Sequence, residues 1–279
     1  MEFLHPIFKW LHIIAGITWI GLLYFFNFIN GHVAATMDGD SKKKVVPELM
    51  PRALYWFRWG AAWTWFTGVV LLLLVFYLSG TISDGGLMPN DFLSSEDEVT
   101  GDKTPANMWV HISLLIPFIA VFLYDFLYKK VKFGITCPIA KNTRVITIVA
   151  FLLIAGIEYA MIHCGAFSYR AFNIHIGAMF GTMMAFNVWF RIWPAQQNII
   201  TAIKNGDAPD PNELALAGLR SKHNTYMSMP LIWTMINQHT TSFSNIFGLP
   251  AGAELMIIIA IGWHVIFQCY KKASKIEGF

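Results

Sequence analysis

The chain is a series of apolar runs, each of about 20 residues, separated by shorter polar stretches. An α-helix of that length crosses the ~30 Å hydrocarbon core of a bilayer, because each residue adds about 1.5 Å along the helix axis. The pattern therefore predicts an all-α integral membrane protein, a single domain over residues 1–279 that forms a bundle of about seven transmembrane helices. The predicted helices cover residues 6–30, 52–78, 107–128, 143–162, 171–193, 224–243 and 251–270.

The composition supports this fold class. Of the 279 residues, 56% are hydrophobic and only 13% are charged, whereas a soluble domain carries roughly 25% charged residues. The formal net charge of +3 is too small to indicate nucleic-acid binding. The three cysteines lie far apart in the sequence, and no CxxCH motif is present, so this chain cannot attach a c-type haem to itself.

Basic residues gather in alternate loops between the predicted helices. The basic residues are Lys42, Lys43 and Lys44 in the first loop; Lys129, Lys130, Lys132 and Lys141 in the third loop; Lys204, Arg220 and Lys222 in the fifth loop; and Lys271, Lys272 and Lys275 in the C-terminal tail. The second loop instead carries a series of acidic residues between Asp84 and Asp102. By the positive-inside rule, the N-terminus lies outside and the C-terminus lies in the cytoplasm, which requires an odd number of spans.

In this orientation, five of the nine histidines fall at one level near the outer ends of their helices: His12, His111, His163, His175 and His239. Glu158 lies one helical turn below His163. Ionisable side chains inside a bilayer are costly, so they are candidates for function. Two imidazoles on different helices can ligate one haem iron from both sides. We therefore predict haem b, with His12 and His175 as axial ligands and His111 and His239 as further cofactor-binding residues.

Other interpretations of these histidines remain open. A copper site is one, although no Met-x-Met motif or Cys–His cluster accompanies the histidines. A proton relay through Glu158 and the histidines is another. On the cytoplasmic side, His32, His223 and His264 suggest a second haem. Gly16 near His12, and Gly177 and Gly181 near His175, leave room for a flat macrocycle, but each glycine taken singly is better explained by close helix packing.

Four stretches of the chain carry a resemblance to a known family: LHIIAGITWIGLLYFFNFING (Leu11 to Gly31), PRALYWFRWGAAWTWFTG (Pro51 to Gly68), FNIHIGAMFGTMMAFNVWFRIWPAQ (Phe172 to Gln196) and SKHNTYMSMPLIWTMINQH (Ser221 to His239). Together they resemble the N-terminal membrane domain of the cytochrome c-linked urate hydroxylases, over nearly the whole chain. This resemblance implies a protein of the bacterial inner membrane that oxidises urate to 5-hydroxyisourate and passes electrons to a cytochrome c.

The resemblance also directs attention to polar residues within the matching stretches. Asn187, Arg191, His223 and Asn224 are the candidate catalytic residues there, and Glu158 joins them from the level of the outer histidines. The sequence ends at Phe279 without the family's C-terminal cytochrome c domain. We therefore expect a separate cytochrome c as the electron acceptor.

Two further functions stay open at this point. The chain is alternatively a non-catalytic b-type haem subunit that relays electrons in a larger respiratory membrane complex. A transporter with a histidine proton path is the third possibility. The first predicted helix also resembles that of the small membrane protoporphyrinogen oxidases, through His12 and Trp19, and this similarity again implies a histidine-ligated porphyrin.

Overall fold

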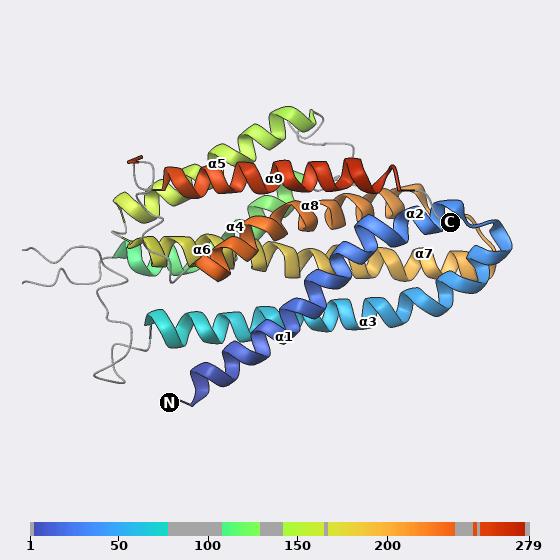
Figure 1. Cartoon of the computed structure of the whole chain (residues 1–279), viewed down its shortest axis with the longest axis horizontal. Coiled ribbons are helices and arrows are strands. Elements are labelled where there is room, and N and C mark those ends of the chain that lie inside the picture. Colours follow the sequence, from blue (N-terminus) through green and yellow to red (C-terminus); the bar gives the residue numbers. More distant parts are fainter. Residues whose placement is uncertain are drawn as a thin grey trace, which may run out of the picture. The chain divides into compact units, whose positions relative to one another are not determined.

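The computed structural model describes residues 3–77, 108–128, 142–164, 167–237, 248–249 and 252–276. Every regular element in these ranges is a helix, which confirms the all-helical prediction for this part of the chain. The α-helices are α1 (Leu4–Tyr24), α2 (Gly31–Thr36), α3 (Gly39–Leu72), α4 (Met108–Tyr128), α5 (Thr143–His163), α6 (Tyr169–Asn187), α7 (Trp193–Asn205), α8 (Pro211–Ile236) and α9 (Ala253–Ala273) (Figure 1). Three π-helical turns continue them: η1 (Phe25–Asn30), η2 (Leu73–Tyr77) and η6 (Val188–Ile192).

Four helical stretches among the described residues are long and apolar enough to cross a membrane: Leu4–Thr36, Gly39–Tyr77, Thr143–His163 and Ala253–Ala273. They contain or overlap the predicted spans 6–30, 52–78, 143–162 and 251–270. A shorter apolar helix, Leu115–Tyr128, lies within the predicted span 107–128. Helices α6 and α8 are more polar because they carry buried side chains such as Asn173, Arg220 and Asn224. The number of spans and their orientation stay predictions.

The polar stretch after the fifth predicted span is not the loop that the sequence suggested. Helix α7 occupies its first part and packs on α8 through Ala195, Ile199 and Ala217. The chain leaves α7 at Gly206, whose φ of 86° is a left-handed conformation that glycine adopts without strain. Helix α8 then starts at Pro211, well before the predicted start at residue 224, so Arg220 lies in a helix. A search for long apolar runs misses short amphipathic helices of this kind.

Helix α3 also begins earlier than predicted, at Gly39 instead of residue 52, so Lys42, Lys43 and Lys44 are helical. Asp38 explains this start. Its carboxylate accepts hydrogen bonds from the backbone N–H and the hydroxyl of Ser41, at 2.8 and 2.7 Å. These bonds stabilise the charged carboxylate, and they lower the pKa of Asp38 below its usual value.

The described helices belong to two compact units. Unit 1 comprises Met1–Leu71, Met184–Pro230 and Ala260–Phe279, and unit 2 comprises Leu72–Met183 and Leu231–Ile259. Helices α3, α6, α8 and α9 contribute residues to both units.

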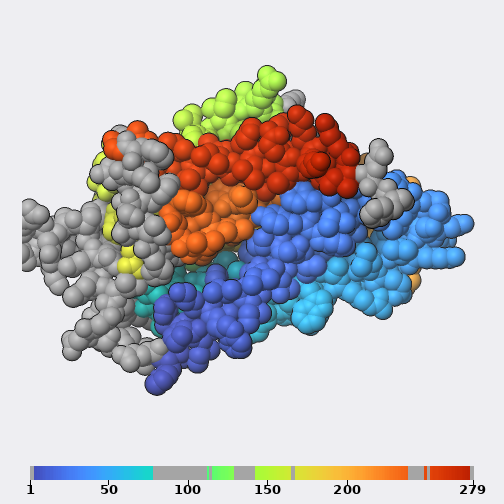
Figure 2. Space-filling view, in the orientation of Figure 1, coloured from blue at the N-terminus to red at the C-terminus, as the bar shows by residue number. Residues whose placement is uncertain are grey.

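Glycines let the helices of unit 1 approach one another closely. A Cβ atom at Gly60 of α3 would lie 3.2 Å from the backbone nitrogen of Trp19 in α1, which is 1% exposed. At Gly262 of α9, a Cβ would lie 3.2 Å from Met229 Cβ and 3.3 Å from Pro230 Cδ of α8. Figure 2 shows α9 (red) against α8 (orange). The small residues in these helices therefore serve helix packing.

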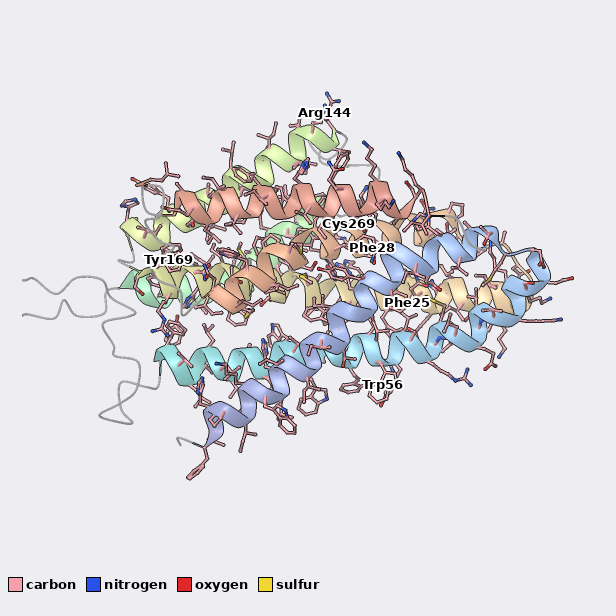
Figure 3. The ribbon with its side chains drawn as sticks, in the orientation of Figure 1. Phe25, Phe28, Trp56, Arg144, Tyr169 and Cys269 are labelled. Carbon is pink, nitrogen blue, oxygen red and sulfur yellow. The ribbon has the colours of Figure 1, made fainter. Side chains whose placement is uncertain are left out.

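In unit 2, a glycine likewise allows α6 and α8 to approach each other closely. A Cβ at Gly177 would lie only 2.1 Å from Thr234 Oγ1, so α8 occupies the space beside this glycine. One turn earlier, Asn173 donates a hydrogen bond to the Thr234 carbonyl at 3.3 Å. Asn237 donates to the hydroxyl of Tyr169, labelled in Figure 3, at 3.0 Å. The room that Gly177 leaves is thus filled by a neighbouring helix.

Candidate functional site

The predicted histidines divide between the two units and the undescribed parts of the chain. His12 belongs to unit 1 and His175 to unit 2. His111 lies in α4, but its side chain is outside the described part, and His239 is outside the described residues altogether. Among the described residues, no group of three or more His, Cys, Asp or Glu side chains is placed to hold a metal ion. The histidine layer therefore stays a prediction.

His12 is half-buried against α3. Its Nδ1 lies 3.0 Å from the hydroxyl oxygen of Thr67. A Cβ at Gly68 would lie 2.9 Å from His12 Cε1, so the imidazole rests directly on this turn of α3. A Cβ at Gly16, which shares the face of His12, would have Thr64 Cγ2 as its nearest neighbour, at 3.9 Å. This face of α1 therefore packs on α3.

His175 is completely buried, and both of its ring nitrogens have hydrogen-bond partners. Nδ1 donates to the Ala171 carbonyl at 2.6 Å, which leaves Nε2 as the acceptor for the Tyr77 hydroxyl, also at 2.6 Å. The rings of Phe76, Tyr77 and Phe167 meet the imidazole edge-on, with centroid distances of 6.0, 5.9 and 5.1 Å. A haem iron at His175 does not fit this arrangement, because side chains of the chain itself occupy Nε2 and the space around the ring.

Two of the predicted catalytic residues meet inside unit 1. Asn187 at the end of α6 donates a hydrogen bond to Asn224 Oδ1 of α8 at 2.8 Å, and both side chains are 0% exposed. Asn224 in turn donates to the Met184 carbonyl at 3.0 Å. Arg220, also 0% exposed, donates from Nη1 to Asn187 Oδ1 at 3.4 Å. We call Arg220, Asn187 and Asn224 the Arg–Asn cluster.

The guanidinium sets the direction of this hydrogen-bond chain. Arginine only donates, so Asn187 must present its oxygen to Arg220 and its NH₂ group to Asn224. Asn224 must then accept through Oδ1 and donate onward to Met184. Burying a guanidinium costs several kcal/mol unless polar groups surround it, and a directed chain of carboxamides supplies such groups. The cluster is therefore cationic and carries carboxamide donors and acceptors.

Hydroxyl and amide groups continue this polar region along α8. Ser221 accepts a hydrogen bond from Asn27 of η1 at 2.8 Å, and Tyr270 of α9 donates to Asn27 Oδ1, also at 2.8 Å. Ser228 lies 2.9 Å from the hydroxyl of Tyr24. The ring of Tyr270 meets the ring of Phe28 edge-on at 5.2 Å; Figure 3 labels Phe28. Unit 1 thus combines buried hydrogen-bonding groups with aromatic rings.

The other predicted catalytic residues differ in their surroundings. Arg191 lies over the ring of Phe186, 5.3 Å from its centroid, and donates to the Phe190 carbonyl at 2.9 Å. His223 is half-buried on α8 beside Asn224.

The sequence interpretation missed Arg220, which it assigned to a basic loop. Its spacing of four residues before Asn224 was the available signal, since residues four apart share one face of a helix.

Glu158 lies in unit 2 and has an unexpected neighbour. It is 3% exposed on α5, and Glu254, in the first turn of α9, is 2% exposed. The two carboxyl groups are close enough for their charges to interact electrostatically. Tyr169 of α6 lies near both, and its hydroxyl accepts the hydrogen bond from Asn237. Unit 2 therefore contains a buried pair of acidic side chains.

Comparison with known proteins identifies the family. No curated protein and no solved structure matches the chain. The family described as urate oxidase N-terminal matches residues 39–276, a range that includes the Arg–Asn cluster, His175 and both buried glutamates. This match covers most of the chain and confirms the resemblance to a family related to urate oxidase. The protein therefore belongs to the urate oxidase N-terminal family.

Proposed function

We propose that the protein is a membrane oxidoreductase that oxidises urate to 5-hydroxyisourate and passes the electrons to a cytochrome c. The observation that carries this proposal is membership of the urate oxidase N-terminal family over residues 39–276. The apolar helices suit a membrane protein, and we place it in the bacterial inner membrane. In the reaction, urate and one water molecule together give 5-hydroxyisourate, which retains the oxygen atom of the water, and they release two electrons and two protons.

The Arg–Asn cluster has the chemistry that such a substrate requires. Urate is a planar heterocycle that is anionic at neutral pH and carries alternating N–H and C=O groups. A guanidinium binds an anion through several parallel N–H groups, and a carboxamide pairs with a lactam through one donor and one acceptor. Arg220 is the cation in our proposal, and Asn187 and Asn224 exchange their mutual hydrogen bond for bonds to the substrate.

Turnover by the purified protein tests this function. The assay follows urate-dependent reduction of ferricytochrome c together with the appearance of 5-hydroxyisourate. We expect activity in the unmodified protein, a large loss in Arg220→Gln, and little change in Lys222→Gln, since Lys222 is exposed on the same helix. A folded protein that neither consumes urate nor reduces an acceptor in its presence would refute the proposal.

A separate proposal concerns the electron carrier of the chain. We propose that the chain binds haem b, which would supply a one-electron redox centre. His175 does not fit as its ligand in the conformation described above. His12, His111 and His239 are the other candidate ligands. An absorption spectrum of the purified protein tests the proposal, because haem gives a Soret band and a reduced α-band. A protein without either band contains no haem.

A further inference from the structure

Within the described ranges, Glu158 and Glu254 lack the hydrogen-bond donors and basic side chains that ordinarily accompany buried acidic groups. Among the described residues, neither carboxyl group accepts a hydrogen bond or forms an ion pair. The Oε1 atom of each is sealed from solvent. An unpaired buried carboxylate costs several kcal/mol, and two like charges in one site cannot both remain ionised. A bound cation or proton is therefore needed to compensate the negative charge of this buried pair.

Within the described part of the chain, no basic side chain forms an ion pair that would supply the missing charge. From α6, Tyr169 lies near both carboxyl groups, and its hydroxyl accepts a hydrogen bond from Asn237, which directly follows α8. On α5 itself, His163 lies beyond Glu158 at the helix end, where it is exposed and faces Tyr159.

The packing around Glu158 is too tight for a metal ion. A Cβ at Gly252 would lie 3.0 Å from Glu158 Cδ and 3.1 Å from its Oε1, so the backbone of this residue presses on the carboxyl group. Gly252 has a φ of 91°, a conformation that favours glycine. A divalent cation needs at least four ligand atoms, whereas a proton needs no cavity. The described residues also provide no metal-binding group of three or more side chains.

We propose that Glu158 and Glu254 form a proton-binding site, in which the two carboxyl groups hold at least one exchangeable proton at neutral pH. The proton resides on a carboxyl oxygen and leaves to water, which regenerates one carboxylate. Both residues lie close to helix ends, Glu158 shortly before the end of α5 and Glu254 in the first turn of α9. The site does not depend on the proposed urate chemistry.

Infrared spectroscopy of the purified protein tests the site directly. A protonated carboxyl group has a C=O stretching band that a carboxylate lacks, and the band shifts in D₂O when the proton exchanges. We expect this band in the unmodified protein at pH 7, a smaller band in Glu158→Gln and in Glu254→Gln, and loss of their component in the double variant. Asp125→Asn is the buried control and Glu48→Gln is the exposed control. Both should retain the glutamate component.

Two results would overturn the proposal. One is a band that the double variant leaves unchanged, since the proton then resides elsewhere. The other is a band that appears in the unmodified protein only after sodium and potassium are removed, which would identify a monovalent cation as the occupant. If the variants fail to fold, the unmodified protein still decides the matter. Its band must exchange in D₂O and disappear as the pH is raised, and a protein with no such band at pH 7 refutes the proton site.

Discussion

A methyl group added at Gly177 tests the close contact between α6 and α8. The Cβ of Gly177→Ala would lie 2.1 Å from Thr234 Oγ1, 2.9 Å from Thr234 Cβ and 3.3 Å from Met235 Cε. Two of these atoms belong to the body of a β-branched residue, so a rotamer change alone does not relieve the clash. The helices must separate or the side chains must leave their preferred conformations.

The expected magnitude follows from two opposing terms. Overpacking a well-packed site costs about 1–3 kcal/mol. Replacing glycine by alanine inside a helix contributes about 1 kcal/mol in the other direction. We therefore expect Gly177→Ala to destabilise the protein by up to ~2 kcal/mol. Gly156→Ala on α5 is the matched control, because a Cβ there meets nothing within 4 Å. It should be neutral or stabilising.

Thermal unfolding of the detergent-solubilised protein measures both variants. Thr234→Gly removes the two threonine atoms that the added methyl group would meet, so the double variant Gly177→Ala with Thr234→Gly should recover part of the loss relative to Thr234→Gly alone. If Gly177→Ala raises the Tm as Gly156→Ala does, the space beside Gly177 is open and our account of the α6–α8 contact is wrong. Such a result would favour the alternative that this glycine makes room for a flat cofactor.

Three further predictions concern individual polar groups. Arg220→Lys keeps the charge but loses the fork of N–H donors, so kcat/KM for urate should fall roughly 10- to 100-fold, and an unchanged value would exclude Arg220 from the site. Tyr77→Phe removes the hydroxyl that meets His175 Nε2 and should cost about 1–3 kcal/mol in thermal or denaturant unfolding, whereas equal stability would contradict that hydrogen bond. Asp38→Ala should lower the Tm at pH 7. Because the folded-state pKa of Asp38 is lowered, its contribution is present above the unfolded pKa and lost as the pH falls, so the Tm difference should disappear in acid.

The sequence predicted the elements that depend on long apolar runs. Such runs correspond to α1, the second half of α3, α5 and α9, because burial in a bilayer demands continuous hydrophobicity. The sequence pattern did not predict α7 or the first parts of α3 and α8. Those helices are amphipathic or polar, and their stability comes from a cap such as Asp38 or from packing such as Ile199 on Ala217.

The candidate site was predicted only as separate residues. Asn187 and Asn224 stood out because they lie in the stretches that resemble the family, and Glu158 stood out because an ionisable side chain within an apolar run is costly. Their partners Arg220 and Glu254 did not, since each lay near a predicted helix end, where charged residues are ordinary. Pairing between helices far apart in sequence depends on tertiary packing, which local periodicity does not encode. The same reason explains why Gly177 suggested room for a cofactor, although Thr234 fills that space.

The most direct test of the central claim is an anaerobic count of electrons. Purified protein is mixed with urate and ferricytochrome c in the absence of oxygen, and urate loss, 5-hydroxyisourate formation and cytochrome reduction are followed together. We expect two molecules of cytochrome c to be reduced for each urate consumed, because cytochrome c accepts one electron at a time. Urate oxidation that proceeds only with oxygen, or cytochrome reduction that does not depend on urate, would contradict the proposed function.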